Sequence, residues 1–316
     1  MTPPTEHVQT WPSGPTPQVV AERVRTLELQ VTRKLDSMLH GAHEGLTPGH
    51  GSDLGESRQY VPGDEVRRID WNVTARTNEV HVRDLIADRE LTTWMLVDLD
   101  ANMDFGTQRD RKSEIAAAAI ATIGFLNVRD SNRLGAMLLA GPHRRPFPPR
   151  PGKDHVRAIL TAALLPPKVD GLGHSDLTDG LHRILANQHH RGMIVIVSDL
   201  RGDGRVGGGL PADLGQATLR HDVLVIQIVD RRDVEIPDVG LINLVDPATG
   251  HEREVVITPA IRDAYQRRAA RFQEELADEI RGTGADHLVL ETGADWLSAI
   301  ARHVRQRRTM RLPRRA

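Results

Sequence analysis

Three oxygen-bearing side chains at the end of one apolar segment could together bind a cation. The segment reads TTWMLVDLDANM, and its last part contains Asp98, Asp100 and Asn102. Side chains at alternate positions of an extended segment point to the same side, so these three can converge. Carboxylate and amide oxygens are hard ligands that suit Mg²⁺, Mn²⁺ or Ca²⁺. The spacing therefore predicts a divalent-cation site at the tip of a strand.

Two other segments could bring further oxygen atoms to the same place. The apolar segment MIVIVSD ends in Asp199, and the loop-to-helix segment GLGHSDLTDG offers Ser175 or Asp176. In an open α/β sheet, the carboxyl ends of the parallel strands form the edge at which ligands bind. We therefore expect three separate segments to supply oxygens to one edge of the sheet.

The Asp-x-Asp pattern also allows an enzymatic alternative, a metal-dependent phosphatase. In haloacid-dehalogenase-like phosphatases the first carboxylate attacks phosphorus and the second handles the proton, which would make Asp98 the nucleophile. That scheme needs Thr or Val at position 102, a positioned lysine and a later acid pair. Asn102 breaks the motif and the chain has only four lysines, although the segment VSDLRGDG could imitate the acid pair.

From residue 91 onward, apolar strands alternate with helices. Strands are predicted for WMLVDL, RLGAMLLAG, MIVIVS, DVLVIQIV and HLVLET, and a hairpin for GLINLVD with EREVVIT. The predicted helices cover residues 115–126, 155–165, 179–187, 212–219, 259–281 and 295–307. Strands that are apolar throughout and separated by helices indicate a parallel sheet covered on both faces. The predicted fold class is α/β, with a doubly wound, mostly parallel sheet.

The first 90 residues look different, because they contain no core of their own. Apolar residues recur near the helical period from residue 17 to 40, which predicts an amphipathic helix, and VHVRDLI fits an edge strand. We expect a disordered leader over 1–16 and a helical and edge-strand extension over 17–90. The α/β domain then covers 91–304, and a basic tail covers 305–316.

A dense polar block within this extension carries a family resemblance. The block reads RQYVPGDEVRRIDWNVTAR, from Arg58 to Arg76. It resembles the R-x-Y-x-P-G-D-D-x-R-x-I-D-W-x-x-(S/T)-A-R hallmark of von Willebrand factor A-like proteins that accompany MoxR-type AAA+ ATPases in bacteria. Glu65 replaces the second Asp of the hallmark. The resemblance covers most of the chain, from about Leu27 to the last predicted helix.

This resemblance implies a metal-ion-dependent adhesion motif, D-x-S-x-S, completed by a Thr and an Asp from later loops. The corresponding positions in this chain, which would hold Mg²⁺ or Mn²⁺ without an organic cofactor, are Asp98, Asp100, Asn102, Ser175 and Asp199. Asp and Asn thus replace the two serines, and Ser replaces Thr. An extra carboxylate lowers the net positive charge of a bound ion, which weakens its attraction for a partner's carboxylate. In the alternative without metal, the acids only cap the next helix or pair with arginines of the block.

The function implied by the resemblance is a non-enzymatic adaptor for a MoxR-type AAA+ ATPase. The polar block then has two possible roles, a structural network with Trp71 as anchor or a surface that docks the partner, since Arg and Trp dominate interface energetics. The residues concerned are Arg58, Tyr60, Asp64, Glu65, Arg67, Asp70, Trp71 and Arg76.

Composition excludes several other classes of protein. A formal net charge of −2 and a pI near 6.7 argue against nucleic acid as the main partner. The absence of cysteine excludes disulfides, thiolate metal sites and cysteine nucleophiles. No apolar run reaches the roughly 20 residues of a bilayer span. We therefore expect a soluble, cytoplasmic protein without membrane insertion, and the partner of the basic tail stays open.

Overall fold

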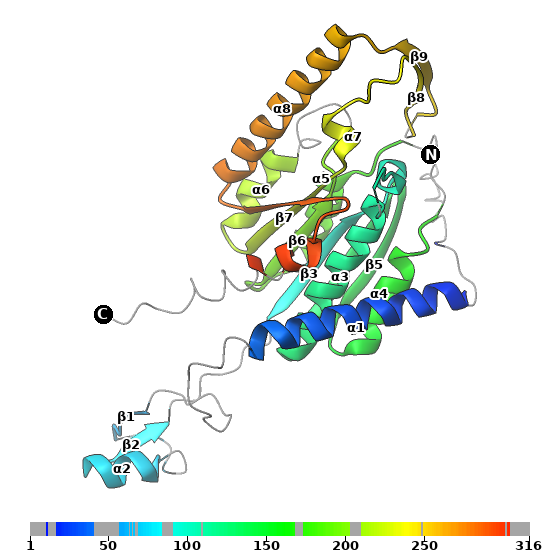
Figure 1. Ribbon diagram of the computed structural model, residues 1–316. Coiled ribbons are helices and arrows are strands. Elements are labelled where there is room, and N and C mark those ends of the chain that lie inside the picture. The colour runs from blue at the N-terminus through cyan, green and yellow to red at the C-terminus, as the bar shows by residue number, and fades with distance from the viewer. Residues whose placement is uncertain are drawn as a thin grey trace, which may run out of the picture. The chain divides into compact units, whose positions relative to one another are not determined.

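The computed structural model describes residue 11 and residues 17–40, 57–62, 64, 66, 69–83, 91–108, 110–167, 173–202, 210–247, 249–300 and 302–303. The chain divides into two compact units (Figure 1). One unit comprises Met1–Met38 with Leu91–Ala316, and the other comprises Leu39–Glu90. The extension expected over residues 17–90 therefore contributes to both units, because its first helix belongs to the larger one.

A sheet of six strands forms the centre of the larger unit, in the order β10-β7-β6-β3-β4-β5. All neighbours are parallel except β4 and β5. The strands are β3 (Thr92–Asp98), β4 (Arg133–Ala140), β5 (His143–Arg150), β6 (Met193–Ser198), β7 (Asp222–Val229) and β10 (Asp286–Glu291). The chain starts in the middle of the sheet and winds outward in both directions, which confirms the predicted doubly wound, mostly parallel sheet.

The Pro-rich stretch after β4 forms the antiparallel edge strand β5, which turns back on β4 directly after Gly141. Pro146, Pro148 and Pro149 lack the N–H group that a central strand needs, and an edge strand tolerates this loss. The composition of the segment therefore suits its place at the edge of the sheet.

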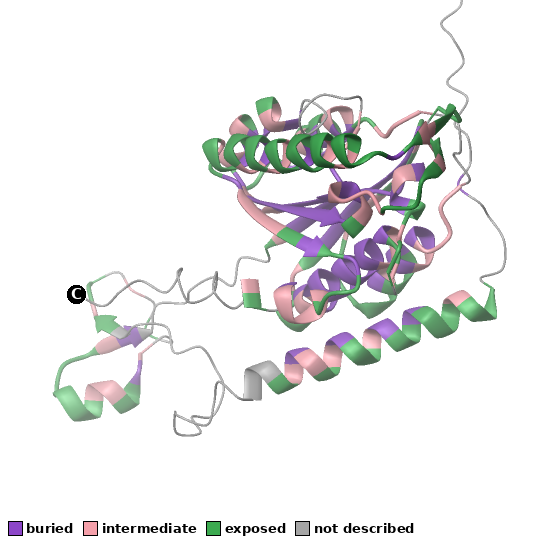
Figure 2. Ribbon diagram, turned by 45° about the horizontal axis from the view of Figure 1, so that its top comes forward, coloured by how far each residue is buried: buried purple, intermediate pink, exposed green. Residues whose placement is uncertain are grey.

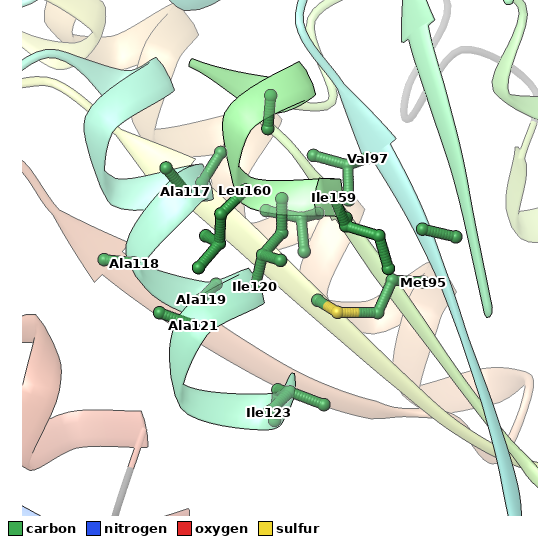
Figure 3. Close-up of a cluster of buried hydrophobic side chains, with 14 of the residues drawn as sticks. Met95, Val97, Ala117, Ala118, Ala119, Ile120, Ala121, Ile123, Ile159 and Leu160 are labelled. Atoms are coloured by element: carbon green, nitrogen blue, oxygen red, sulfur yellow. The ribbon is translucent and has the colours of Figure 1, made fainter. Parts of the chain in front are cut away.

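Helices cover both faces of the sheet and bury two apolar clusters (Figure 2). Alternate residues of β3 contribute to opposite clusters, Met95 and Val97 to one and Trp94 and Leu96 to the other. Beside Met95 and Val97 lie α3 (Lys112–Arg129) and α4 (Lys153–Ala163), which meet at Ile120 and Ile159 (Figure 3). The opposite face is covered by α5 (Leu177–Asn187), α6 (Leu210–Thr218) and α8 (Pro259–Gly282).

Helix α1 (Gln18–His40) packs on the first cluster through a stripe at helical spacing, Val24, Leu27, Val31 and Leu35. Ahead of it, Trp11 is also buried, and its indole N–H donates to the carbonyl oxygen of Ala162 at 3.0 Å. The sequence prediction of a disordered leader over residues 1–16 did not anticipate this anchor, because a lone tryptophan among prolines has no periodic pattern.

The remaining elements of the larger unit follow the carboxyl ends of β3 and β7. They are the 3₁₀ helix η2 (Ala101–Asp104), the short helix α7 (Arg231–Val234) and the antiparallel hairpin of β8 (Leu241–Val245) and β9 (Glu252–Val256). This hairpin confirms the one predicted for GLINLVD with EREVVIT. Residues 296–300 and 302–303 are helical within the predicted last helix. Among the described helices, none combines the length and apolar character of a membrane span.

The smaller unit consists of β1 (Ser57–Gln59), α2 (Trp71–Thr77) and β2 (His81–Arg83). Strands β1 and β2 pair antiparallel, and Ile69 adds one further bridge to Val82. Of the predicted edge strand VHVRDLI, the structure describes only the part up to Arg83. The only large apolar side chain that this unit buries, among its described residues, is Val82.

Candidate functional site

The structure brings the five predicted metal ligands to one end of the sheet. Asp98 ends β3, and Asp199 follows the neighbouring strand β6. The hydroxyl of Ser198 donates to Asp98 at 2.8 Å, and the hydroxyl of Ser175 lies close enough to this carboxyl group to lower its pKa. Asp98, Asp100 and Asp199 are all buried. We call the five residues Asp98, Asp100, Asn102, Ser175 and Asp199 the strand-end cluster.

Side-chain to backbone hydrogen bonds hold the turn after β3 in place. Asp98 accepts from the N–H of Asp100 at 3.1 Å, and Asp100 accepts from the N–H of Asn102 at 2.9 Å. Asp100 is thereby the N-cap of η2, whereas the alternative without metal expected both Asp98 and Asp100 to cap the following helix or to pair with arginines. Between the two candidates from the loop before α5, Asp176 caps that helix, while Ser175 joins the strand-end cluster.

Burial and negative neighbours raise the pKa of Asp98 well above its ordinary value. Burial contributes most, and the charges of Asp100 and Asp199 add to it. The hydroxyl groups of Ser175 and Ser198 oppose this rise but do not cancel it. The centre of the strand-end cluster therefore carries more negative charge than its hydrogen-bond donors compensate.

A buried lysine lies at the edge of the cluster, and sequence reasoning missed its role. Lys112 is 1% exposed, and its ammonium group contacts Asp199 at 2.9 Å and Asp233 at 2.8 Å. Burial lowers the pKa of Lys112, but the two carboxylates outweigh it, so the pKa lies above its ordinary value. The signal was present in the sequence as a lysine at the start of the apolar helix KSEIAAAAIATIGFL.

His174 is a second residue of the site that the sequence did not indicate. Its Nδ1 atom lies 3.1 Å from the amide nitrogen of Asn102 and 3.4 Å from a carboxylate oxygen of Asp100. The hydrogen bond with Asp100 raises the pKa of His174 above its ordinary value, although burial opposes this. The imidazole therefore compensates part of the charge of Asp100.

A cleft of about 1050 Å³ lies beside the strand-end cluster. One wall includes Asn102, Lys112 and Asp199, and the other includes the β8–β9 hairpin with Ile242, Leu244 and Val245. Tyr265 of α8 also lines it and donates to the carbonyl oxygens of Arg232 and Asp233. The charged side chains of the lining are mixed, namely Asp104, Lys112, His174, Asp199, Arg201, Arg232, Asp233, Glu235 and Asp246.

The chemistry of the strand-end cluster fits a divalent cation. Its donors are hard oxygens, and the mutual repulsion of Asp98, Asp100 and Asp199 is the kind of charge that a cation would relieve. Across the described part of the chain, no group of three or more His, Asp or Glu side chains is arranged to hold a metal by itself. The amide of Asn102 or the hydroxyl of Ser175 would therefore have to complete the set.

The polar block forms a local network in the smaller unit. Arg58 makes two hydrogen bonds of 2.7 Å to Asp64, which also accepts from the N–H of Val61 at 2.9 Å. The backbone of Tyr60 pairs with Val80. Glu65 and Arg67 lie outside the described residues.

Helix α2 carries the rest of the block. Asp70 is buried and caps the helix by accepting from the N–H groups of Asn72 and Val73. Trp71 is 69% exposed, so it is not an anchor in the core of its unit, and Arg76 is exposed in the last turn. The network is itself partly at the surface, because the side chain of Arg58 is 44% exposed.

Comparisons with solved structures show similarity at low sequence identity. The chain is similar to BatB from Bacteroides thetaiotaomicron, with a TM-score of 0.40 and 14% identity, covering 69% of this chain and 99% of that one. It is also similar to the SpRpn10 VWA domain, with a TM-score of 0.39 and 12% identity, covering 67% of this chain and 94% of that one.

Comparisons with sequences reach much higher identity. The uncharacterized protein Rv1480 of Mycobacterium tuberculosis (strain ATCC 25618 / H37Rv) is 46% identical over 289 residues, which cover 92% of this chain and 90% of the relative. The uncharacterized protein MAV169 of Mycobacterium avium is 35% identical over 161 residues, covering 51% of this chain and 93% of the relative. Residues 56–275 match the model of the family described as "Protein of unknown function DUF58". The chain therefore belongs to the DUF58 family.

Proposed function

We propose that this DUF58 protein is a non-enzymatic interaction module that binds a protein partner in the cleft beside the strand-end cluster. The observation that carries the proposal is the composition of this cleft. It combines a volume of about 1050 Å³ with apolar side chains that are exposed at its rim, including Phe105, Leu244 and Val245. Concave surfaces with apolar walls and a few polar groups are where proteins bind ligands and partners.

The partner that we propose is a MoxR-type AAA+ ATPase, on the basis of the resemblance of the block from Arg58 to Arg76. The ATPase would supply the work of remodelling or maturation, and this chain would connect it to a client. The exposed side chain of Trp71 supports a second contact surface on the smaller unit, because exposed Trp and Arg are typical of interface hot spots.

We further propose that Mg²⁺ or Mn²⁺ binds at Asp98, Asp100, Asn102, Ser175 and Asp199. When bound, the ion would neutralise the carboxylates that otherwise repel one another. The chain's own part is to hold these oxygens in place, through the N–H groups of Asp100 and Asn102 and the hydroxyl of Ser198.

The phosphatase alternative is less well supported. Asp98, its nucleophile, is 4% exposed and does not line the cleft. Hydrolysis of p-nitrophenyl phosphate with Mg²⁺ tests this alternative. Turnover that disappears in Asp98→Asn would show that the protein is an enzyme and not the interaction module proposed above.

Binding of the purified MoxR-type ATPase from the same genome tests the main proposal. We expect Leu244→Asp, at the cleft rim, to weaken binding at least tenfold in biolayer interferometry. Leu241→Asp is the matched control, because Leu241 lies on the same strand, is 61% exposed and does not line the cleft. Equal binding by both variants would overturn the cleft as the docking site.

Two further arms of this experiment separate the remaining alternatives. Loss of binding in Trp71→Ala alone, with Leu244→Asp unaffected, would move the docking site to the smaller unit. Binding that persists in EDTA would show that the ion is not needed for capture and would favour the metal-free scaffold.

A further inference from the structure

Lys112 connects three elements at the carboxyl end of the sheet. It is the first residue of α3, Asp199 follows β6, and Asp233 belongs to α7. The side chains of Lys112 and Asp199 are 2% and 3% exposed, and that of Asp233 is 11% exposed. An ammonium group buried this deeply persists only with good partners, because its desolvation is costly.

Both carboxylates are held in place for this contact. The other oxygen of Asp199 accepts from the N–H of Arg201 at 3.1 Å. The oxygen of Asp233 that contacts Lys112 also accepts from the N–H of Asp230 at 2.7 Å. The three charged groups therefore form a preorganised arrangement, and neither carboxylate can turn away from Lys112 without also breaking its hydrogen bond to a backbone N–H group.

Asp199 is a potential partner of two cations, the ammonium group of Lys112 and the proposed divalent ion. In the proposed site it is one of the residues that bind Mg²⁺ or Mn²⁺, yet one of its oxygens already contacts the ammonium group of Lys112 at 2.9 Å. A divalent ion close to this carboxylate would be repelled by the ammonium group, and burial makes such repulsion stronger than in water. The two cations therefore compete for the same carboxylate.

We infer that Lys112 is an internal counter-ion that withholds Asp199 from the divalent cation and so sets the strand-end cluster to a low cation affinity. This inference rests on the proposed function, because it concerns the cation site proposed there. Lys112 keeps Asp199 and Asp233 in place without any metal. The direct ligands of the five-residue site proposed above are thereby reduced to Asp98, Asp100, Asn102 and Ser175, with Asp199 close by but engaged by Lys112. Lys112 is in this sense a positioning residue.

Thermal melting of the full chain in EDTA and in a titration with MnCl₂ tests the inference. We expect Lys112→Met to melt at a lower temperature than wild type in EDTA, because two buried carboxylates lose their counter-ion. We expect Mn²⁺ to restore this loss, with a midpoint concentration at least tenfold lower than that of wild type. In the control Lys112→Met with Asp199→Asn, the midpoint should rise again, because the released carboxylate is gone.

A second comparison does not depend on the folding of the Lys112 variant. In the wild-type background, Asp199→Asn should raise the Mn²⁺ midpoint only slightly, because it leaves the ammonium group of Lys112 less compensated. Asp100→Asn should raise the midpoint at least tenfold, because it removes a ligand. A rise in Asp199→Asn equal to that in Asp100→Asn would overturn the inference, because Asp199 would then serve the ion despite Lys112.

The outcomes distinguish the inference from the proposed cation site. A clear Mn²⁺ response with the same midpoint in wild type and Lys112→Met would overturn the inference and leave the site standing. No response in either protein, with both folded, would remove the cation site itself. A response in Lys112→Met alone would support the inference in its strongest form, in which the lysine excludes the ion.

Discussion

Asp98 and Asp230 are both buried carboxyl groups at the carboxyl ends of parallel strands. Their surroundings nevertheless shift their pKa values in opposite directions. Asp230, which follows β7, is 0% exposed and accepts four hydrogen bonds. The donors are the N–H and hydroxyl of Thr107, the hydroxyl of Thr292 and the N–H of Arg232. Asp98 also has hydroxyl and N–H donors, but Asp100 and Asp199 lie close to it.

The pKa values follow this difference. Burial by itself raises the pKa of Asp230, but the hydrogen bonds from Thr107, Thr292 and Arg232 outweigh it, and the pKa lies below its ordinary value. The pKa of Asp98 is instead raised by burial together with its negative neighbours. Burial alone therefore does not decide the charge of a strand-end carboxyl group in this protein. Asp230 joins the segments that carry Thr107, Thr292 and Arg232, and we call this set of hydrogen bonds the Asp230 clasp. Asp98 instead has the features of a site that needs a counter-charge.

The largest effect is expected from removal of the clasp. Asp230→Ala removes the acceptor of four hydrogen bonds, which are donated by Thr107, Thr292 and Arg232. Hydrogen bonds to a charged group stabilise the fold more than those between neutral groups. We expect a loss of about 3 kcal/mol or more in the free energy of unfolding, measured by urea denaturation. A loss below about 1 kcal/mol would show that Asp230 is not a clasp.

Acid should weaken the same clasp in wild type. Because the folded pKa of Asp230 lies below the unfolded value, its contribution is complete above the unfolded pKa, at about 3.9, and is lost as pH falls through the folded pKa. We expect urea midpoints between pH 5 and pH 2 to fall more steeply for wild type than for Asp230→Asn. Parallel curves would assign the acid sensitivity to other carboxylates.

A smaller effect is expected when one donor is removed. Thr292→Val keeps the size of the side chain but deletes the hydroxyl that donates to Asp230 at 2.6 Å, and we expect a loss of about 1.5 kcal/mol. Thr249→Val is the matched control, because its hydroxyl donates at the same distance to the carboxylate of Asp246 at an exposed position. Equal losses in the two variants would mean that burial adds nothing to the clasp.

The smallest effect should have the opposite sign. Asp98→Asn removes a charge that its neighbours disfavour, so in EDTA at pH 7 we expect unchanged stability or a gain of about 1 kcal/mol in the free energy of unfolding. Urea denaturation beside Asp230→Asn makes the comparison direct, since both variants exchange a buried carboxylate for an amide. A similar loss of stability in Asp98→Asn and Asp230→Asn would contradict the opposite pKa shifts of the two carboxyl groups.

Much of the larger unit could be predicted from the pattern of its residues. The four central strands β3, β4, β6 and β7 are apolar over nearly their whole length, as expected for strands that are buried on both faces. Their order along the chain, with intervening helices, indicated the doubly wound class. The convergence of Asp98 and Asp199 followed from the same reasoning, because adjacent parallel strands end at one edge. Local spacing also placed the β8–β9 hairpin.

Other features depend on contacts between residues that lie far apart in the sequence. Lys112 and Asp199 are 87 positions apart, and Trp11 and Ala162 are 151 positions apart. No periodic pattern reports such a pair, because periodicity describes only the face of an element and not what covers it. The choice of Ser175 rather than Asp176 for the strand-end cluster likewise depended on where α5 begins.

The amino-acid sequence by itself thus determined the fold class and the edge of the sheet at which the acids gather, since these follow from hydrophobic pattern and strand direction. Only the tertiary structure decided which acids are compensated. That outcome depends on distances of about 3 Å between side chains from different elements, and packing alone brings Lys112 to Asp199, and Thr107 and Thr292 to Asp230.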